Sequence, residues 1–195
     1  MIMYTVDYKP RLQKYLDKEM EVVKSLNLEE INTVMNVLEE AKDQGKTTYI
    51  CGNGGSAATA SHFVCDFNKG LNDEASQFNF VCLSDNTPIM MAISNDIGYD
   101  ETFRYQIKGR IKPGDIFFGI SGSGNSMNVI NGMEYAKSIG AKTIALVGYD
   151  GGKMKQIADY YIHVNVNNMQ ISEDLHMVMD HLMMYTLSNM GPGDK

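Results

Sequence analysis

Five short apolar runs alternate with helical patterns through most of this chain, and this alternation limits the fold more than any other feature. The runs cover residues 47–51, 78–83, 115–120, 142–147 and 160–166. They are apolar at consecutive positions rather than at every second one, which is typical of strands buried on both faces. Parallel strands joined by helices bury both faces of a sheet. The sequence therefore predicts an α/β fold, a three-layer αβα sandwich with a five-stranded parallel sheet.

Apolar residues recur at helical spacing between these runs and on both sides of them. Two helices are expected before the first strand, over residues 8–26 and 31–41. The later helices are expected over residues 56–67, 87–93, 100–110, 126–138, 153–158 and 172–188. No linker separates the first two helices from the rest. We therefore expect a single domain over residues 1–195, with N-terminal helices at 1–45, a core at 46–190 and a frayed C-terminal tail.

Charge and composition narrow the class of protein. The net charge of −7 argues against a nucleic-acid partner, because such proteins carry a basic face. It permits a phosphorylated ligand, since backbone N–H groups and hydroxyls bind phosphate without lysines. The N-terminus has no signal-peptide pattern, no run is long enough to span a membrane, and the three cysteines form no C-x-x-C pair. We expect a cytoplasmic protein with reduced thiols and no membrane partner.

The first strand is expected to end in a glycine-rich loop, Gly52-Asn53-Gly54-Gly55, with a helix starting at Ser56. Glycines allow a ligand to approach closely, and a helix start offers free N–H groups and a positive dipole end. This pattern predicts an anion site, although a turn without a ligand remains an alternative. The loop also fits the dinucleotide fingerprint G-x-G-x-x-A. A P-loop is excluded, because no Gly-Lys-Ser/Thr follows.

The third strand is expected to end in a second loop, which contains Ser121, Gly122, Ser123 and Ser126. Three serine hydroxyls can surround one phosphate, but a Ser/Gly turn before a helix gives the same pattern. Ligands of open parallel sheets bind beyond the carboxyl ends of the strands, where the strand order reverses. Two such loops near that point favour a compact phosphorylated ligand and no nucleotide cofactor.

Two helices carry titratable residues in apolar surroundings. His62 and Asp66 lie four residues apart and therefore on one helical face. The last helix carries Glu173 and His181, while His176 faces elsewhere and is interpreted as structural. A carboxylate and an imidazole from separate helices suit an aldose–ketose shift, in which a proton moves between neighbouring carbons through an enediol or enediolate. The same nitrogen and oxygen donors suit a divalent metal such as zinc.

Four segments carry a resemblance to a known family. CGNGGSAATASHF, AISNDIGYDETF, KPGDIFFGISGSGNS and LVGYDGGKMKQIAD occur in this order and resemble the sugar isomerase (SIS) family, in particular phosphoheptose isomerase, which acts on sedoheptulose 7-phosphate. The similarity extends over about residues 49–181. It implies a flavodoxin-like fold and a homotetramer with active sites at the subunit interfaces. It also implies conversion of a ketose phosphate into an aldose phosphate for surface-polysaccharide precursors.

The resemblance also assigns roles to individual residues. The catalytic glutamate and histidine of the family fall on Asp66 and His181, and some members bind zinc through the equivalents of His62, Asp66, Glu173 and His181. The substrate-binding residues that we expect are Asn53, Gly54, Ser56, Asn95, Asp96, Ser121, Gly122, Ser123 and Ser126.

Two departures from the family pattern leave open which residue is the catalytic base. The family glutamate is Asp66 here, which is one methylene shorter, and the family glutamine is Glu173, which adds a charge. Either carboxylate is a candidate base, so we count Glu173 with the catalytic residues. Some SIS proteins instead bind a phosphosugar or a replication-initiator protein without catalysis, and this remains the alternative function.

Overall fold

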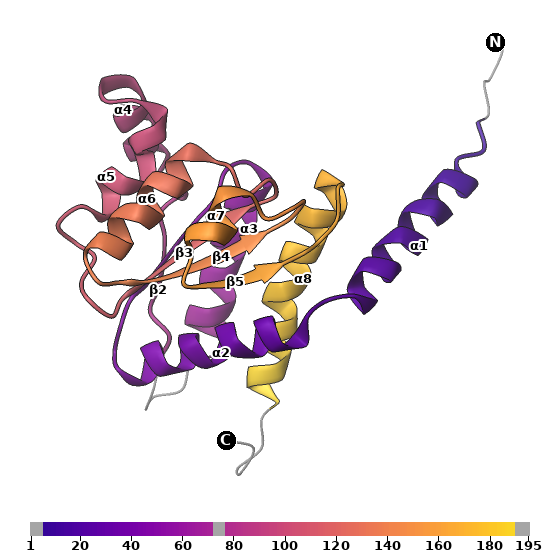
Figure 1. Ribbon diagram of the computed structural model, residues 1–195, viewed down its shortest axis with the longest axis horizontal. Helices are drawn as coiled ribbons and strands as arrows, with labels where there is room; N and C mark the ends of the chain where they lie inside the picture. The colour runs from indigo at the N-terminus through magenta and orange to yellow at the C-terminus, as the bar shows by residue number, and fades with distance from the viewer. Residues whose placement is uncertain (1–5, 72–76, 190–195) are drawn as a thin grey trace.

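The computed structural model describes residues 6–71 and 77–189 (Figure 1). The strands are β1 (Thr48–Cys51), β2 (Phe80–Cys82), β3 (Ile116–Ser121), β4 (Lys142–Val147) and β5 (Tyr160–His163). The α-helices are α1 (Lys9–Lys24), α2 (Leu28–Asp43), α3 (Gly55–Cys65), α4 (Thr87–Asp96), α5 (Thr102–Ile107), α6 (Met127–Ser138), α7 (Gly152–Ile157) and α8 (Met169–Ser188). A π-helical turn, η1 (Asp66–Gly70), continues α3, and a 3-10 turn, η2 (Tyr99–Glu101), precedes α5. The C-terminal tail expected to fray lies outside the described residues.

All neighbouring strands pair in parallel, in the order β2-β1-β3-β4-β5. The chain builds outward from β1 in one direction to β2 and then in the other to β3, so the strand order reverses between β1 and β3. The predicted α/β sandwich with a five-stranded parallel sheet is therefore confirmed. The loops after β1 and β3 lie on either side of this reversal point, where an open sheet forms its ligand crevice.

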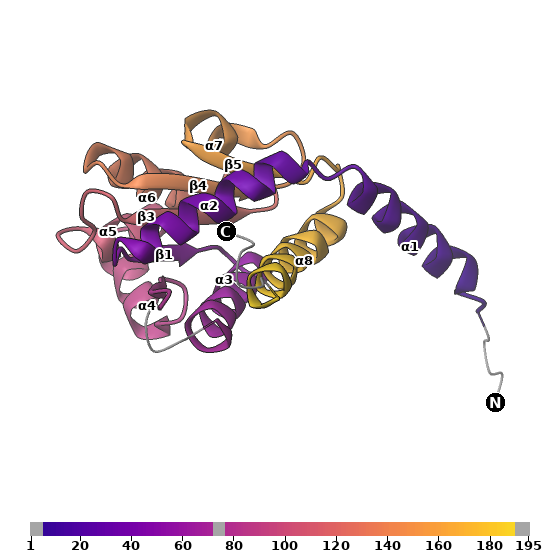
Figure 2. The ribbon, with the colours of Figure 1, turned by 90° about the horizontal axis from the view of Figure 1, so that it is seen from below.

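Successive residues of a strand point to opposite sides of the sheet. A different set of helices covers each side. Phe118 and Ile120 of β3 pack in a core with side chains of α2, α3 and α8. Phe117, which directly precedes Phe118, packs in a second core with side chains of α5, α6 and α7. Figure 2 shows α6 and α7 on one side of the sheet and α3 and α8 on the other. This layering places α3 and α8 next to each other, with the C-terminal half of each helix available to build a site.

The first helix projects away from the body of the molecule (Figures 1 and 2). Its apolar residues Leu12, Leu16 and Met20 are 60%, 51% and 51% exposed. They recur every fourth residue and therefore form one stripe along the helix. The helix packs against the rest of the protein near its C-terminal end. There Val22 is buried in a small core with residues of α8 and of the loop that follows β5. Most of the apolar stripe of α1 thus has no covering from the residues that the structure describes.

Several element boundaries differ from expectation by up to three residues, and two of them have a clear physical reason. The predicted strand 160–166 ends at His163. Val164 N still donates to the Val147 carbonyl of β4, but the side chains of Val164 and Val166 pack with α1 and α8. Helix α2 begins at Leu28, three residues early, because the Asn27 side chain caps it by accepting a hydrogen bond from Glu29 N at 3.0 Å. Within residues 6–71 and 77–189, no helix is both long and apolar enough to cross a membrane.

Candidate active site

The loop after β1 turns sharply and starts α3 with a glycine. Gly54 has a φ of 53°, a conformation that favours glycine. Ser56 lies in the first turn of α3 and is buried. The N–H groups of a first helical turn have no partner within the helix and form its positive end. The loop therefore has the geometry of an anion site, with Ser56 at its base.

Side chains from two other elements hold Asn53. Its amide exchanges two hydrogen bonds with the amide of Asn128 on α6, at 2.9 and 2.8 Å. The hydroxyl of Tyr99 donates to Asn53 Oδ1 at 2.7 Å. Asn95 and Asp96, also expected to contact substrate, are exposed at the end of α4, where Asn95 Nδ2 donates to Asp96 Oδ1 at 2.8 Å. The sequence indicated neither Asn128 nor Tyr99, because no motif linked them to the first loop.

The serine loop begins at the end of β3, next to the first loop. Ser121 Oγ lies 3.0 Å from Ser126 Oγ and accepts a hydrogen bond from Gly124 N at 3.1 Å. Ser123 Oγ accepts a backbone N–H two residues further on, at 3.2 Å. Ser121 and Gly122 are buried, whereas Ser123 and Ser126 are half-buried. The loop is thus prearranged by its own hydroxyls, and two of them face a partly open surface.

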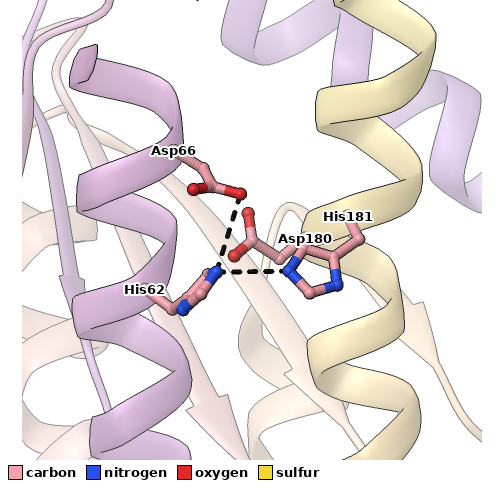
Figure 3. Close-up of side chains that lie close together, drawn as sticks. All are labelled: His62, Asp66, Asp180 and His181. Carbon is pink, nitrogen blue, oxygen red and sulfur yellow. Dashed lines mark hydrogen bonds and ion pairs between the residues drawn. The ribbon is translucent and has the colours of Figure 1, made fainter. Parts of the chain in front are cut away.

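Titratable side chains from α3, η1 and α8 converge where these elements cross (Figure 3). His62 Nε2 lies 3.7 Å from Asp66 Oδ2 and 3.2 Å from His181 Nε2. The two imidazole rings meet edge to face, with an interplanar angle of 77°. The structure therefore brings together three of the residues expected at the acid–base site, and their individual roles remain predictions.

A fourth residue of this group, Asp180, was not predicted. One donor atom from each of His62, Asp66, Asp180 and His181 lies within 4.8 Å of the others. Asp180 is 0% exposed, and burial, together with the charge of Asp66, raises the pKa of its carboxyl to about 7. The available signal was a charged residue within an apolar stretch of the last helix. It was not decisive, because only the crossing of α3 and α8 shows which face of α8 meets His62.

The structure places Glu173 apart from this group. A Cβ at Gly55, in the first turn of α3, would lie 2.6 Å from Glu173 Oε2 and 2.8 Å from Oε1. The carboxylate of Glu173 therefore lies against the start of α3, beside the first loop. His176, expected to be structural, is fully buried, and burial lowers the pKa of its imidazole to about 4.

The arrangement supports two kinds of chemistry. Carboxylate and imidazole groups within one cluster can move protons at neighbouring atoms of a bound substrate. The same nitrogen and oxygen donors can hold a metal ion, and the buried Asp180 carboxylate, which has no hydrogen-bond partner among the described residues, fits such a role. The two loops would bind the anionic end of the substrate at the reversal point of the sheet.

Comparison with known proteins identifies the class to which this fold and site belong. A model of the SIS domain family matches residues 13–148, so the chain is a SIS-domain protein. It is 38% identical to a probable phosphoheptose isomerase from Thermoplasma acidophilum over 87% of this chain and 93% of that protein. It is 36% identical to a phosphoheptose isomerase from Helicobacter pylori over 90% of this chain and 88% of that protein. The chain belongs to the phosphoheptose isomerase family, whose members are sugar-phosphate isomerases.

A solved structure shows the same relationship at the level of the fold. The phosphoheptose isomerase from Neisseria gonorrhoeae superposes with a TM-score of 0.87 at 26% identity, covering 94% of this chain and 100% of that one. The resemblance noted in the sequence motifs is therefore confirmed, and so is the fold class that it implied.

Proposed function

We propose that this protein isomerises sedoheptulose 7-phosphate to glycero-manno-heptose 7-phosphate. In support, its relatives are named phosphoheptose isomerases. The observation that carries the proposal is the convergence of His62, Asp66, Asp180 and His181 beside α3, whose first turn forms the anion site. The phosphate of the substrate would bind at the start of α3, and the carbonyl end of the same substrate would lie at the histidine–aspartate cluster near the end of α3.

The isomerisation moves one hydrogen from C1 to C2 of the sugar. A carboxylate, Asp66 or Glu173, removes the proton from C1 of the ketose and leaves an enediolate, and His181 supplies a proton on the oxygen side. Return of a proton to C2, while His181 takes back the proton of the C1 hydroxyl, then gives the aldose. Asp66 lies with His62 in the cluster, whereas Glu173 lies at the first loop, so the geometry favours Asp66 as the base.

Zinc fits the donor set of this cluster. His62, Asp66 and His181 offer the nitrogen and oxygen donors typical of zinc sites, and an unpartnered buried carboxylate lies among them. When bound, zinc would polarise the substrate carbonyl as a Lewis acid.

The phosphate end of the substrate is assigned to the two loops. Ser56 and the free N–H groups of α3 form one side, and Ser121, Ser123 and Ser126 form the other. We assign contacts with the sugar hydroxyls to Asn53, whose side chain is held by hydrogen bonds with Asn128 and Tyr99.

We propose a homotetramer in which α1 mediates contacts between subunits. The support is the exposed apolar stripe of Leu12, Leu16 and Met20 on a helix that has little contact with its own chain. Isolated helices of this length are marginal in water, so packing against another subunit would stabilise α1.

The test is incubation of the purified protein with sedoheptulose 7-phosphate in deuterated water, with and without added zinc. We expect an aldose heptose phosphate and deuterium incorporation at the exchanged carbon. The variant His181→Ala should lose at least about 100-fold in turnover, because general acid–base groups contribute factors of this size.

The same variant separates catalysis from simple binding. If the protein only bound a phosphosugar, the wild type would show no turnover and His181→Ala would keep the ligand affinity. The comparisons with phosphoheptose isomerases do not favour this alternative. Absence of product and of deuterium uptake in the wild-type protein, under both metal conditions, would refute the proposal for this substrate.

A further inference from the structure

A cavity of about 310 Å³ lies at the edge of the sheet opposite the candidate active site. Its walls come from the segment that leads into β1 and from the loop between α5 and β3, so it lies at the amino ends of these strands. The first loop and the serine loop follow the carboxyl ends of the same strands. The six residues of β3, at about 3.3 Å each, separate the two edges by about 20 Å. The cavity is therefore separate from the crevice of the active site.

Three cationic side chains line this cavity. They belong to Lys46, before β1, and to Arg110 and Lys112, in the loop before β3. Ile111, between the last two, is buried in the second core and anchors the loop. Within residues 6–71 and 77–189, none of the three cations forms an ion pair with a carboxylate. In a chain with a net charge of −7, this is a local concentration of positive charge without acidic partners.

An aspartate also lines the cavity, but the backbone holds its carboxylate. Asp115 is buried, and its Oδ1 accepts a hydrogen bond from Thr47 N at 3.0 Å, while its Oδ2 accepts one from Lys112 N at 2.8 Å. The ammonium of Lys46 donates to the Pro113 carbonyl at 3.2 Å, which holds it at the mouth of the same loop. Three positive charges and one negative charge leave the lining with two positive charges in excess.

Tyr49 of β1 adds a hydroxyl to this lining. Its side chain is half-buried, and burial raises the pKa of its phenol; the charge of Asp115 raises this pKa further, and that of Arg110 lowers it. The phenol is therefore protonated at neutral pH and can donate a hydrogen bond. Its hydroxyl has no hydrogen-bond partner among the residues that the structure describes.

We propose that this basic cavity, lined by Lys46, Tyr49, Arg110 and Lys112, is a second anion site that binds a phosphate dianion, either free or as the ester of a small organic molecule. A phosphate ester carries a charge of about −1.5 to −2 at pH 7, which matches the excess charge of the lining. Ammonium and guanidinium groups donate charge-assisted hydrogen bonds to phosphate oxygens. The volume lies at the small end of the range of about 300–1,000 Å³ for ligand pockets, so the ligand is small. The proposal is independent of the isomerase activity.

The test counts the phosphate ions bound per chain, by equilibrium dialysis of the full-length protein with radiolabelled inorganic phosphate. We expect two in the wild type, one at the serine loop and one in the basic cavity. Lys46→Gln/Arg110→Gln removes two cations and should weaken phosphate binding in the cavity more than about tenfold, so that one ion remains. Arg11→Gln/Lys14→Gln removes the same two charges at exposed positions on α1 and serves as the matched control, which should bind two.

A single variant, Lys112→Gln, keeps the test valid if the double variant does not fold, because Lys112 is exposed and such substitutions change stability little. It should weaken phosphate binding in the cavity about threefold or more. Competition with glycerol 2-phosphate distinguishes the two sources of the ligand, since a phosphate ester would displace the label at lower concentration than unlabelled phosphate does.

Three results would overturn the proposal. The first is that Lys112→Gln and the folded double variant Lys46→Gln/Arg110→Gln bind phosphate with the wild-type number and affinity. The second is that the control variant Arg11→Gln/Lys14→Gln loses binding to the same extent, which would indicate only a general effect of charge. The third is that the wild type binds no phosphate.

Discussion

The amides of Asn53 and Asn128 form a reciprocal pair across the crevice, with two hydrogen bonds of 2.9 and 2.8 Å. Asn53 belongs to the first loop and Asn128 to the first turn of α6, directly after the serine loop. The pair therefore ties the two proposed phosphate-binding loops together and fixes the orientation of Asn53.

Replacement of Asn128 by leucine should disturb the site through Asn53. Asn128→Leu leaves a polar amide without its partner, which costs about 1–3 kcal/mol. We expect a corresponding loss of stability in urea unfolding and a drop of about tenfold in kcat/KM. Asn131→Leu, on the same helix but bonded to the carbonyl of Asp100, is the control and should retain near-normal kinetics. Unchanged kinetics in Asn128→Leu would show that substrate binding does not depend on this pair.

The contact between Gly55 and Glu173 can be tested by a double-mutant cycle. Gly55→Ala adds a methyl group where the Glu173 carboxylate lies, so it should displace that side chain. We expect Gly55→Ala to lower kcat/KM in the wild type and to have no such effect in the Glu173→Ala background, with a coupling of about 1 kcal/mol. Equal effects in both backgrounds would mean that the methyl group acts on the loop itself.

The buried imidazole of His176 should make the protein less stable in mild acid. Its pKa is lowered to about 4 in the folded state by burial, whereas the unfolded chain has the ordinary value near 6.5. Between these values the unfolded state binds more protons, so the free energy of unfolding falls as the pH decreases. From pH 7.5 to pH 5.0, protonation of His176 should lower the free energy of unfolding by about 2 kcal/mol. In urea unfolding at both pH values, the free energy of unfolding of His176→Leu should therefore change by about 2 kcal/mol less than that of the wild type. An identical change in the two proteins would contradict the prediction.

A charge introduced into the apolar stripe of α1 should change the oligomeric state. Leu16→Glu introduces a carboxylate at a position that we propose to be buried between subunits, so light scattering should show dissociation from the tetramer. Lys14→Glu, on the same helix, adds a carboxylate at another exposed position and should leave the assembly intact. A tetramer that persists in Leu16→Glu would place the subunit contact elsewhere.

The architecture was predictable from the sequence because it depends on local patterns. Each strand is a mainly apolar run, and β4 has the predicted bounds, Lys142–Val147. The loops after β1 and β3 were predictable as neighbours, since parallel strands present their carboxyl ends at one edge of the sheet. The end of β5 was not, because Val164 and Val166 are as apolar as strand residues but pack with other helices.

The candidate site was predictable only in part. The four-residue spacing of His62 and Asp66 indicated a shared face, and that pair is present. The positions of Glu173 and Asp180 depend on how α8 crosses α3, which no spacing within α8 reveals. The π-helical turn at η1, which begins at Asp66, also has no sequence signal, although such turns are frequent near functional sites.

Helix α3 has a further consequence for substrate choice. Ser56 in its first turn and His62 six residues later are separated by about 9 Å of helix rise, which is on the order of the length of an extended seven-carbon chain. An α-helix cannot be lengthened by one residue without rotating everything beyond it by about 100°, which would turn His62 away from His181. In the proposed binding mode, α3 therefore sets the distance between the phosphate and the carbonyl end of the sugar, and we expect a change of sugar length to require a change in the loops rather than in α3.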